Sequence, residues 1–286
     1  MTISGFICTL NPEEWCFPYL EALRSYLDMF DEVIVVDGGS TDGSLNKIQA
    51  LSSSIEIVTL DWPWNYGQRE FARHYNFGFE QCTGDWAFKL DCDWLFHETD
   101  MAEFRTVLQG YNSNPSVAVV RQPKLTMLNR QKYHHKGKMT NGIHMRYWRD
   151  RLRCGVVRGK EGECDWTNIV QNFEERDGVY YGELLPEGLH ARLPTTIYNY
   201  DCFFRTREKC RVWYERSARA YFKDTGHMTY GDPENSWVAW CDMMRARREA
   251  TQSRVLKVNN HPKYIQDRLN SMTPDMWGWN NWEWKL

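Results

Sequence analysis

Strand and helix patterns alternate over roughly the first 120 residues, and this order constrains the fold more than any other feature of the sequence. Residues 33–36 form a continuous run of Val and Ile, which is typical of a central strand buried on both faces. Apolar side chains recur at helical spacing between residues 17 and 30. Three further strands are predicted, at residues 4–9, 55–60 and 86–90. The order predicts an α/β, Rossmann-like fold, in which a mostly parallel central sheet carries helices on both faces.

Two loops carry residues that favour the start of a helix. In the first loop, Asn11 is suited to be the N-cap, Pro12 to occupy the first helical position and Glu14 to reach back from the third. In the second loop, Ser40 or Thr41 is expected to cap the helix that follows.

The pattern becomes less regular beyond residue 120. Strands are expected at 143–160 and 178–192, and helices at 206–223, 237–251 and 261–272. No repeat or low-complexity linker divides the chain. We therefore predict one continuous domain over residues 1–202 and a C-terminal helical extension over residues 203–286.

The composition argues against several classes of protein. A formal net charge of −3 without a long basic run gives no reason to expect nucleic-acid binding. The nine cysteines contain no CxxC pair, so the spacing typical of zinc sites is absent. An odd number of cysteines without a secretory signal favours reduced thiols and a cytoplasmic location. No stretch approaches the ~18 apolar residues of a transmembrane helix.

Tryptophan is abundant, and four of the 14 tryptophans crowd the end of the chain. These four are Trp277, Trp279, Trp282 and Trp284. Docking of the tail on the body would bury their aromatic faces. The alternative is contact with a partner, including self-association through this cluster.

Three polar features follow predicted strands, and ligands of open α/β sheets bind at the carboxyl ends of the strands. These features are the loop after Thr9, the loop that begins at Asp37, and the triplet Asp91-Cys92-Asp93. The chain has neither a GxGxxG fingerprint nor a Walker-type phosphate loop. A diphosphate would then need positive charge from elsewhere, and a hard cation on two carboxylates supplies it. By itself the triplet is also compatible with two solvated loop aspartates.

Longer stretches match a known family. The run Asp37-Gly38-Gly39-Ser40-Thr41-Asp42-Gly43-Ser44 resembles the D-G/D-S-T-D-G-S/T element of the family 2 glycosyltransferases, which have the GT-A fold. Asn76-Phe77-Gly78 and Thr83-Gly84-Asp85-Trp86 resemble the stretch that leads to the metal motif of that family. The resemblance covers roughly the first 95 residues. It implies that residues 1–95 form a nucleotide-sugar-binding half and residues 96–202 an acceptor and catalytic half.

The resemblance also implies roles for individual residues. Asp93 would ligate a divalent cation, Mn²⁺ or Mg²⁺, and Asp91 would approach both the ribose and the metal. Asp37 would accept a hydrogen bond from the base, as a carboxylate can from a uracil imide. Further residues expected beside the donor are Thr9, Asn11, Glu14, Gly38, Gln68, Arg69 and Cys92. Arg69 and Arg73 share a helix face, which could instead be simply solvated.

Two positions depart from the family. Trp94 stands where members commonly have Glu, and either a wall beside the sugar or core packing explains it. Asn199, in Ile197-Tyr198-Asn199-Tyr200, stands where similar members carry a His that completes the metal site. His190 is the nearest substitute as a metal ligand, although a structural role also explains it.

The transfer step needs a carboxylate base near the acceptor hydroxyl. The best local supply of acids is the run from Gly159 to Asp165, in which we favour Glu163, then Glu161, then Asp165. Any of them could instead be a solvated loop acid. The basic segment 129–138 is expected to be a mobile loop that closes over the donor phosphates.

The resemblance thus predicts a metal-dependent, inverting glycosyltransferase. It would move a sugar from a nucleoside-diphosphate donor, with UDP favoured and dTDP or GDP open, to a glycan hydroxyl. Trp94, Asn199 and the unassigned base motivate an alternative, a catalytically degenerate module that binds sugars or partners. A sugar nucleotidyltransferase is disfavoured because residues 9–14 are acidic rather than basic and Gly-rich.

Overall fold

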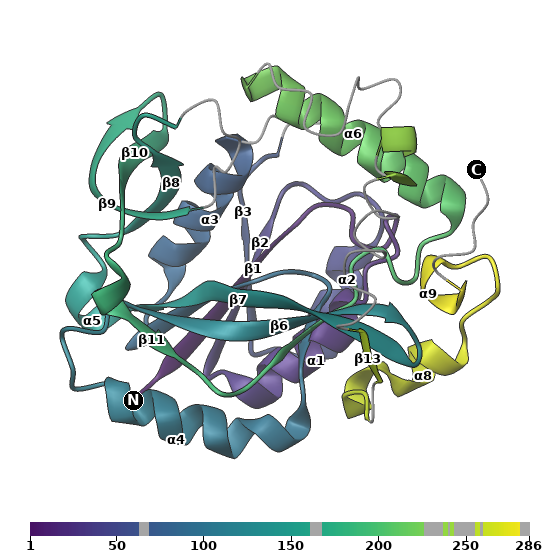
Figure 1. Cartoon of the computed structure of the whole chain (residues 1–286), viewed down its shortest axis with the longest axis horizontal. Helices are drawn as coiled ribbons and strands as arrows, with labels where there is room; N and C mark the ends of the chain where they lie inside the picture. The colour runs from purple at the N-terminus through teal and green to yellow at the C-terminus, as the bar shows by residue number, and fades with distance from the viewer. Residues whose placement is uncertain are drawn as a thin grey trace.

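The computed structural model describes residues 1–62, 69–160, 168–225, 237–239, 241–242, 255–257 and 260–280. Within these residues, ten strands form one sheet in the order β3-β2-β1-β4-β7-β6-β12-β5, with β11 and β13 paired to its second half. Figure 1 shows the sheet through the middle of the molecule, with α4 (Met101–Tyr111) along one edge and α6 (Arg207–Thr225) at the opposite end.

The first half of the sheet is parallel. It consists of β1 (Ile3–Thr9), β2 (Glu32–Asp37), β3 (Ile55–Thr59) and β4 (Trp86–Leu90). Strand β1 pairs in parallel with both β2 and β4, and β2 pairs in parallel with β3. The carboxyl ends of all four strands therefore meet at one edge of the sheet, which confirms the predicted α/β fold.

The second half of the sheet is mixed. A long hairpin of β6 (Val119–Asn129) and β7 (Lys132–His144) pairs antiparallel to β4 through β7. The short strand β12 (Ile197–Asn199) lies between β6 and β5 (Trp94–Phe96). Strand β11 (His190–Arg192) pairs with β6, and β13 (Val255–Lys257) pairs with β7. The expectation of a loop over 129–138 is wrong, because the backbone of this segment forms the tip of the hairpin.

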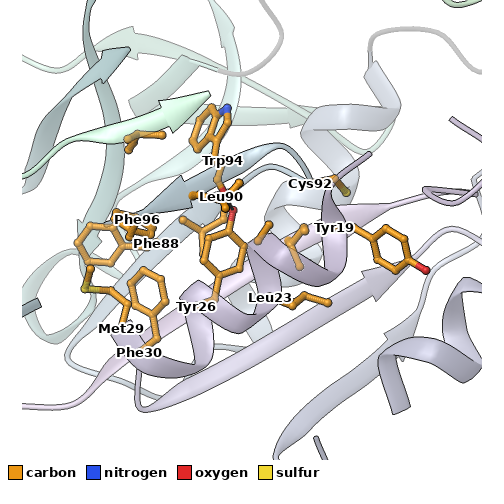
Figure 2. Packing of buried hydrophobic residues seen from close by; sticks show 14 of the residues in the cluster. Tyr19, Leu23, Tyr26, Met29, Phe30, Phe88, Leu90, Cys92, Trp94 and Phe96 are labelled. Carbon is orange, nitrogen blue, oxygen red and sulfur yellow. Dashed lines mark hydrogen bonds between the residues drawn. The ribbon is translucent and has the colours of Figure 1, made fainter. Parts of the chain in front are cut away.

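Helices cover both faces of the sheet. On one face, α1 (Tyr19–Met29), α2 (Ser44–Leu51) and α4 share a core with Ile3, Phe88 and Phe96. On the other face, α3 (Arg69–Gln81) packs Ala72 and Phe79 against Phe6 and Val36. Figure 2 shows the first of these cores, where Tyr26 of α1 and Phe30 directly after this helix lie against the aromatic side chains of β4 and β5.

Two predicted helix starts are wrong. Helix α1 begins at Tyr19, after Pro18, and Asn11 instead adopts a left-handed conformation with φ of 49°. Helix α2 begins at Ser44, whose N–H donates to Asp42 Oδ1 (3.0 Å). The Ser40 hydroxyl accepts from the N–H of Asn11 (2.9 Å), so Ser40 is used to join two loops rather than to cap a helix.

A small closed barrel of three strands stands beside α3. Its strands are β8 (Arg153–Val157), β9 (Asn168–Arg176) and β10 (Val179–Leu184), and it is preceded by α5 (Met145–Trp148) and followed by the 3-10 turn η2 (Glu187–Leu189). Asn76 of α3 fastens the barrel, since its amide donates to Cys154 O and accepts from Cys154 N, both at 2.8 Å.

The C-terminal part packs on the same core as the sheet. Turn η4 (Lys263–Ile265) and helix α8 (Gln266–Asn270) bury Ile265 and Leu269 against the α1 face. Helix α9 (Trp277–Asn280) buries Trp277 against Cys202, Cys210 and Tyr214. Trp277 thus docks on the body, whereas Trp282 and Trp284 lie outside the described residues. The division between residues 202 and 203 stays a prediction.

Two further expectations can be compared with the structure. In the described part of the chain, no disulfide joins any two of the eight cysteines. Among the described residues, no helix combines the length and the apolar character needed to cross a membrane.

Candidate functional site

A cavity of about 370 Å³ opens at the carboxyl ends of β1 and β4. The parallel half contributes Thr9 and the segment from Asp91 to Trp94. Strands β6 and β12 contribute Lys124, Asn199 and the adjoining Asp201. The rest of the wall is mainly aromatic and consists of Phe17, Trp62, Phe71, Tyr75 and Trp213, together with Cys8, Leu10 and Arg216. Because Trp213 and Arg216 belong to α6, the C-terminal part completes the cavity.

Two tyrosine hydroxyls hold the Asp91-Cys92-Asp93 turn in place. The hydroxyl of Tyr26 lies 2.7 Å from Asp91 O and 2.6 Å from Trp94 O, so it can donate to either carbonyl (Figure 2). The hydroxyl of Tyr75 donates to Asp91 Oδ1 (3.1 Å). The turn therefore presents Asp91 and Asp93 to the cavity from a fixed backbone.

Asp93 is the most constrained of these acids. It is only 7% exposed. Burial, followed by the charges of Asp201 and Asp91, raises the pKa of Asp93 to about 7, although Lys124 and Arg205 act in the opposite direction. A buried carboxylate among other carboxylates is stabilised by a cation, which is the chemistry that a divalent metal site requires.

Asp37 presents an acceptor beside this cavity. The side chain is 1% exposed, and its Oδ2 accepts from the N–H groups of Gly39 and Ser40, both at 2.9 Å. Its Oδ1 is buried and has no hydrogen-bond partner in the described part of the chain. Gly38 is needed here for space, because a Cβ at this position would lie 2.7 Å from Trp62 Cβ. Asp37 does not itself line the cavity, but it pairs across β1 and β2 with Thr9, which does.

Asn11 and Glu14 connect the first loop to the Asp37 loop. Asn11 Oδ1 accepts from Thr41 N (2.7 Å), and Asn11 Nδ2 donates to Glu14 Oε2 (3.1 Å). The N–H of Glu14 donates to Asp42 Oδ2 (2.9 Å). Neither residue lines the cavity. Their contact with a nucleoside therefore stays a prediction, while their role in joining the two loops is visible.

The two arginines of α3 that were predicted near the donor do not line the cavity. Arg69 and Arg73 lie on α3, but the side chains of this helix that line the cavity are Phe71 and Tyr75. Arg73 pairs with Glu70 at 3.4 Å. Gln68 lies outside the described residues. Cys92 is buried with its Sγ 3.8 Å from Cys8 O, at the cavity wall.

The predicted third metal ligand, His190, does not line the cavity that holds Asp93, and the predicted bases cannot be compared with the structure. His190 lies on β11 opposite Val119, with Nε2 3.4 Å from Leu185 O, and it does not line the cavity. Glu161, Glu163 and Asp165 lie outside the described residues. Trp94 packs in the core and is almost fully buried, and it also lines the cavity, so a contact with a sugar stays a prediction.

The sequence did not point to several of the residues that line the cavity. The ammonium of Lys124 lies 4.4 Å from the centre of the Trp94 ring. Asp201 lies 4.0 Å from Nη1 of the buried Arg205, whose guanidinium stacks on Phe17 and Trp213. Lys124 comes from a segment without a motif, whereas Asp201 directly follows the Ile197–Tyr200 element. The only available signal was the acidic residue directly after the Ile197–Tyr200 element.

The residues present fit a hard divalent cation. In the described part of the chain, no three His, Cys, Asp or Glu side chains converge closely enough to hold a metal ion by themselves. Asp91 and Asp93 nevertheless offer the carboxylate oxygens that Mg²⁺ and Mn²⁺ take. Mg²⁺ in particular is commonly held by one or two carboxylates together with substrate phosphates.

The parallel sheet, the buried aspartates and the cavity at the strand ends define an α/β protein with a candidate ligand site at the carboxyl ends of its strands. The sequence profile described as glycosyl transferase family 2 matches residues 4–161. Since this match covers more than half of the 286 residues, the chain belongs to glycosyl transferase family 2, a family of GT-A fold.

Curated relatives match a smaller part. The lipopolysaccharide core biosynthesis glycosyltransferase LpsC of Rhizobium meliloti is 32% identical over 94 residues, which cover 32% of this chain and 32% of LpsC. An uncharacterized glycosyltransferase of Rickettsia typhi is 29% identical over 128 residues, which cover 45% of this chain and 39% of that protein. The matched region thus spans about a third to two-fifths of these relatives.

Solved structures show more distant similarity. Staphylococcus aureus TarS in complex with UDP aligns over 87% of this chain and 72% of its own, with 12% identity and a TM-score of 0.41. Glucosyl-3-phosphoglycerate synthase from Mycobacterium tuberculosis, in complex with Mn²⁺ and UDP, aligns over 43% of this chain and 44% of its own, with 23% identity and a TM-score of 0.31.

Proposed function

We propose that this chain transfers a sugar from a nucleoside-diphosphate donor to a hydroxyl of a glycan acceptor, with the help of a divalent cation. Membership of glycosyl transferase family 2 supports the reaction class. The observation that carries the proposal is the buried Asp93, which faces the cavity beside Asp91 at the end of β4. Carboxylates in this position can hold a cation, and the cation can in turn bind a diphosphate.

We favour UDP as the nucleotide. The buried Oδ1 of Asp37 lacks a partner in the described part of the chain and is suited to accept the imide N–H of uracil. Thymine has the same imide edge, so dTDP would be accepted at this atom as well. GDP would need a different contact, and a donor panel separates the three.

Each part of the chain has a distinct task in the proposed mechanism. Asp93 and Asp91 would hold Mn²⁺ or Mg²⁺, which supplies positive charge to the leaving diphosphate. Tyr26 and Tyr75 keep the turn that carries both aspartates rigid. The aromatic wall excludes water from the donor. For an inverting reaction, we retain Glu163, then Glu161, then Asp165 as the proposed base.

Calorimetric titration of UDP tests the proposal. We expect tight binding with Mn²⁺ and weak binding in EDTA, followed by turnover of at least one sugar donor in a panel. Absence of any metal-dependent nucleotide binding would refute the proposal. Metal-dependent binding without turnover of any donor would favour a degenerate binding module instead.

A further inference from the structure

One buried amide oxygen in the cavity wall has no partner in the described part of the chain. Asn199 is 3% exposed and lines the cavity together with Asp91 and Asp93. Its Nδ2 donates to Thr126 Oγ1 at 3.4 Å, whereas its Oδ1 accepts nothing. A buried acceptor of this kind destabilises the fold unless a ligand uses it.

The backbone fixes this oxygen close to the metal motif. Strand β12 runs antiparallel to β5, and Asn199 pairs directly with Trp94. The N–H of Tyr200 donates to the carbonyl of Asp93 at 2.9 Å. Side chains directly opposite each other in an antiparallel pair point to the same face, so Asn199 and Trp94 form one wall beside Asp93.

Besides the thiols of Cys8 and Cys92, the atoms that the described residues offer to a cation at this wall are oxygens. None of the histidines whose side chains are described lines the cavity. His74 contacts the carbonyls of Glu70 and Leu60, and His261 contacts Tyr200 and the Arg130 carbonyl. An imidazole ligand favours transition metals, whereas carboxylate and amide oxygens suit Mg²⁺ and Mn²⁺ alike.

We propose that Asn199 Oδ1 ligates the divalent cation next to Asp93, in an all-oxygen site that only the diphosphate of the donor completes. This inference rests on the proposed function. It has two consequences. The free protein binds the cation weakly, because the remaining positions belong to diphosphate and water oxygens. In addition, the site discriminates little between Mn²⁺ and Mg²⁺.

The test measures Mn²⁺ binding through the EPR signal of free Mn²⁺, with and without saturating UDP. In the wild type, we expect Mn²⁺ to bind the complex of the protein with UDP more tightly than it binds free UDP. Asn199→Leu keeps the volume and removes the oxygen, and we expect it to weaken Mn²⁺ binding in the UDP complex roughly tenfold. The matched control is Asn141→Leu, because Asn141 is also buried with an unpartnered Oδ1 but lies outside the cavity. This control should bind Mn²⁺ as the wild type does.

A second variant keeps the test decisive if Asn199→Leu does not fold. Asn199→His introduces an imidazole, and competition with Mg²⁺ should show a preference for Mn²⁺ that is raised roughly tenfold. An unchanged preference, or wild-type Mn²⁺ binding in a folded Asn199→Leu, would overturn the inference alone. If the wild type shows no UDP-dependent Mn²⁺ binding, the proposed function itself fails.

Discussion

The two halves of the sheet contribute to the cavity in different ways. In the parallel half, the candidate site residues lie at the ends of their strands, since Asp37 is the last residue of β2 and Asp91 directly follows β4. In the mixed half, the residues of the wall come from β6, β12 and α6 and meet only after the chain has folded. We therefore expect the first half to set the type of ligand, and the second half to set the shape and charge around it.

The largest expected effect lies in the parallel half. Asp93→Asn should lower the rate of sugar transfer by roughly a thousandfold or more, because it removes a direct cation ligand. Thermal unfolding should show a fold at least as stable, since the substitution removes a buried charge whose ionisation is unfavourable. The exposed Asp150→Asn is the control. Transfer near the wild-type rate would contradict the donor site proposed here.

The mixed half is tested by Lys124→Met. We expect a loss of roughly tenfold in kcat/KM, because the change removes a positive charge that faces Asp93 and the donor diphosphate. Lys124→Arg retains the charge and should keep more of the activity. A loss of activity in Lys124→Met as large as that in Asp93→Asn would contradict the expectation that the mixed half contributes less to transfer than the parallel half.

A smaller effect concerns the support beneath the metal motif. Tyr26→Phe removes the hydroxyl that can donate a hydrogen bond to the carbonyl of Asp91 or of Trp94. We expect this change to lower the free energy of unfolding by about 1–2 kcal/mol. Urea denaturation measures this change. The hydroxyl of Tyr111 donates to the Arg192 carbonyl at the surface, so the control Tyr111→Phe should lower the free energy of unfolding by less. Equal losses in the two variants would show that the motif needs no such support.

The smallest expected effect is at Arg73, for which the sequence left open a donor contact or a solvated helix face. Arg73→Ala should change the affinity for UDP by less than roughly twofold, because Arg73 is exposed and paired with Glu70 rather than turned to the cavity. Calorimetry with Mn²⁺ present measures this affinity. A loss greater than tenfold would restore the direct donor contact that its place on the helix suggested.

The predictable part of the fold rests on short-range patterns. The run Val33–Val36 and the alternation before Asp91 each lie within a few residues, so strands β1 to β4 and their loops follow from the sequence alone. The motif residues Asn76 and Gly78 serve packing, since Asn76 binds Cys154 and Gly78 lets Phe6 approach α3. Such residues identify the family without taking part in its chemistry.

The remainder depends on contacts between distant segments. The sequence places the start of α1 too early, because the side chain of Asn11 does not cap a helix. It bonds instead to Thr41 in the neighbouring loop and to Glu14 in its own loop. The basic composition of 129–138 indicated a loop, yet pairing of β6 with β7 overrides this local preference. Lys124 and Asp201 carry no motif, and only the strand order brings them to Asp93.

The contribution of α6 to the cavity has a consequence for biosynthesis. A nascent chain acquires both aspartates of the metal motif long before Trp213 and Arg216 are synthesised. Until those residues dock, the first half of the sheet can form, but its ligand site lacks a wall. Nucleotide binding would therefore begin only late in synthesis. Its onset would mark the time at which the last third of the protein packs against the first third.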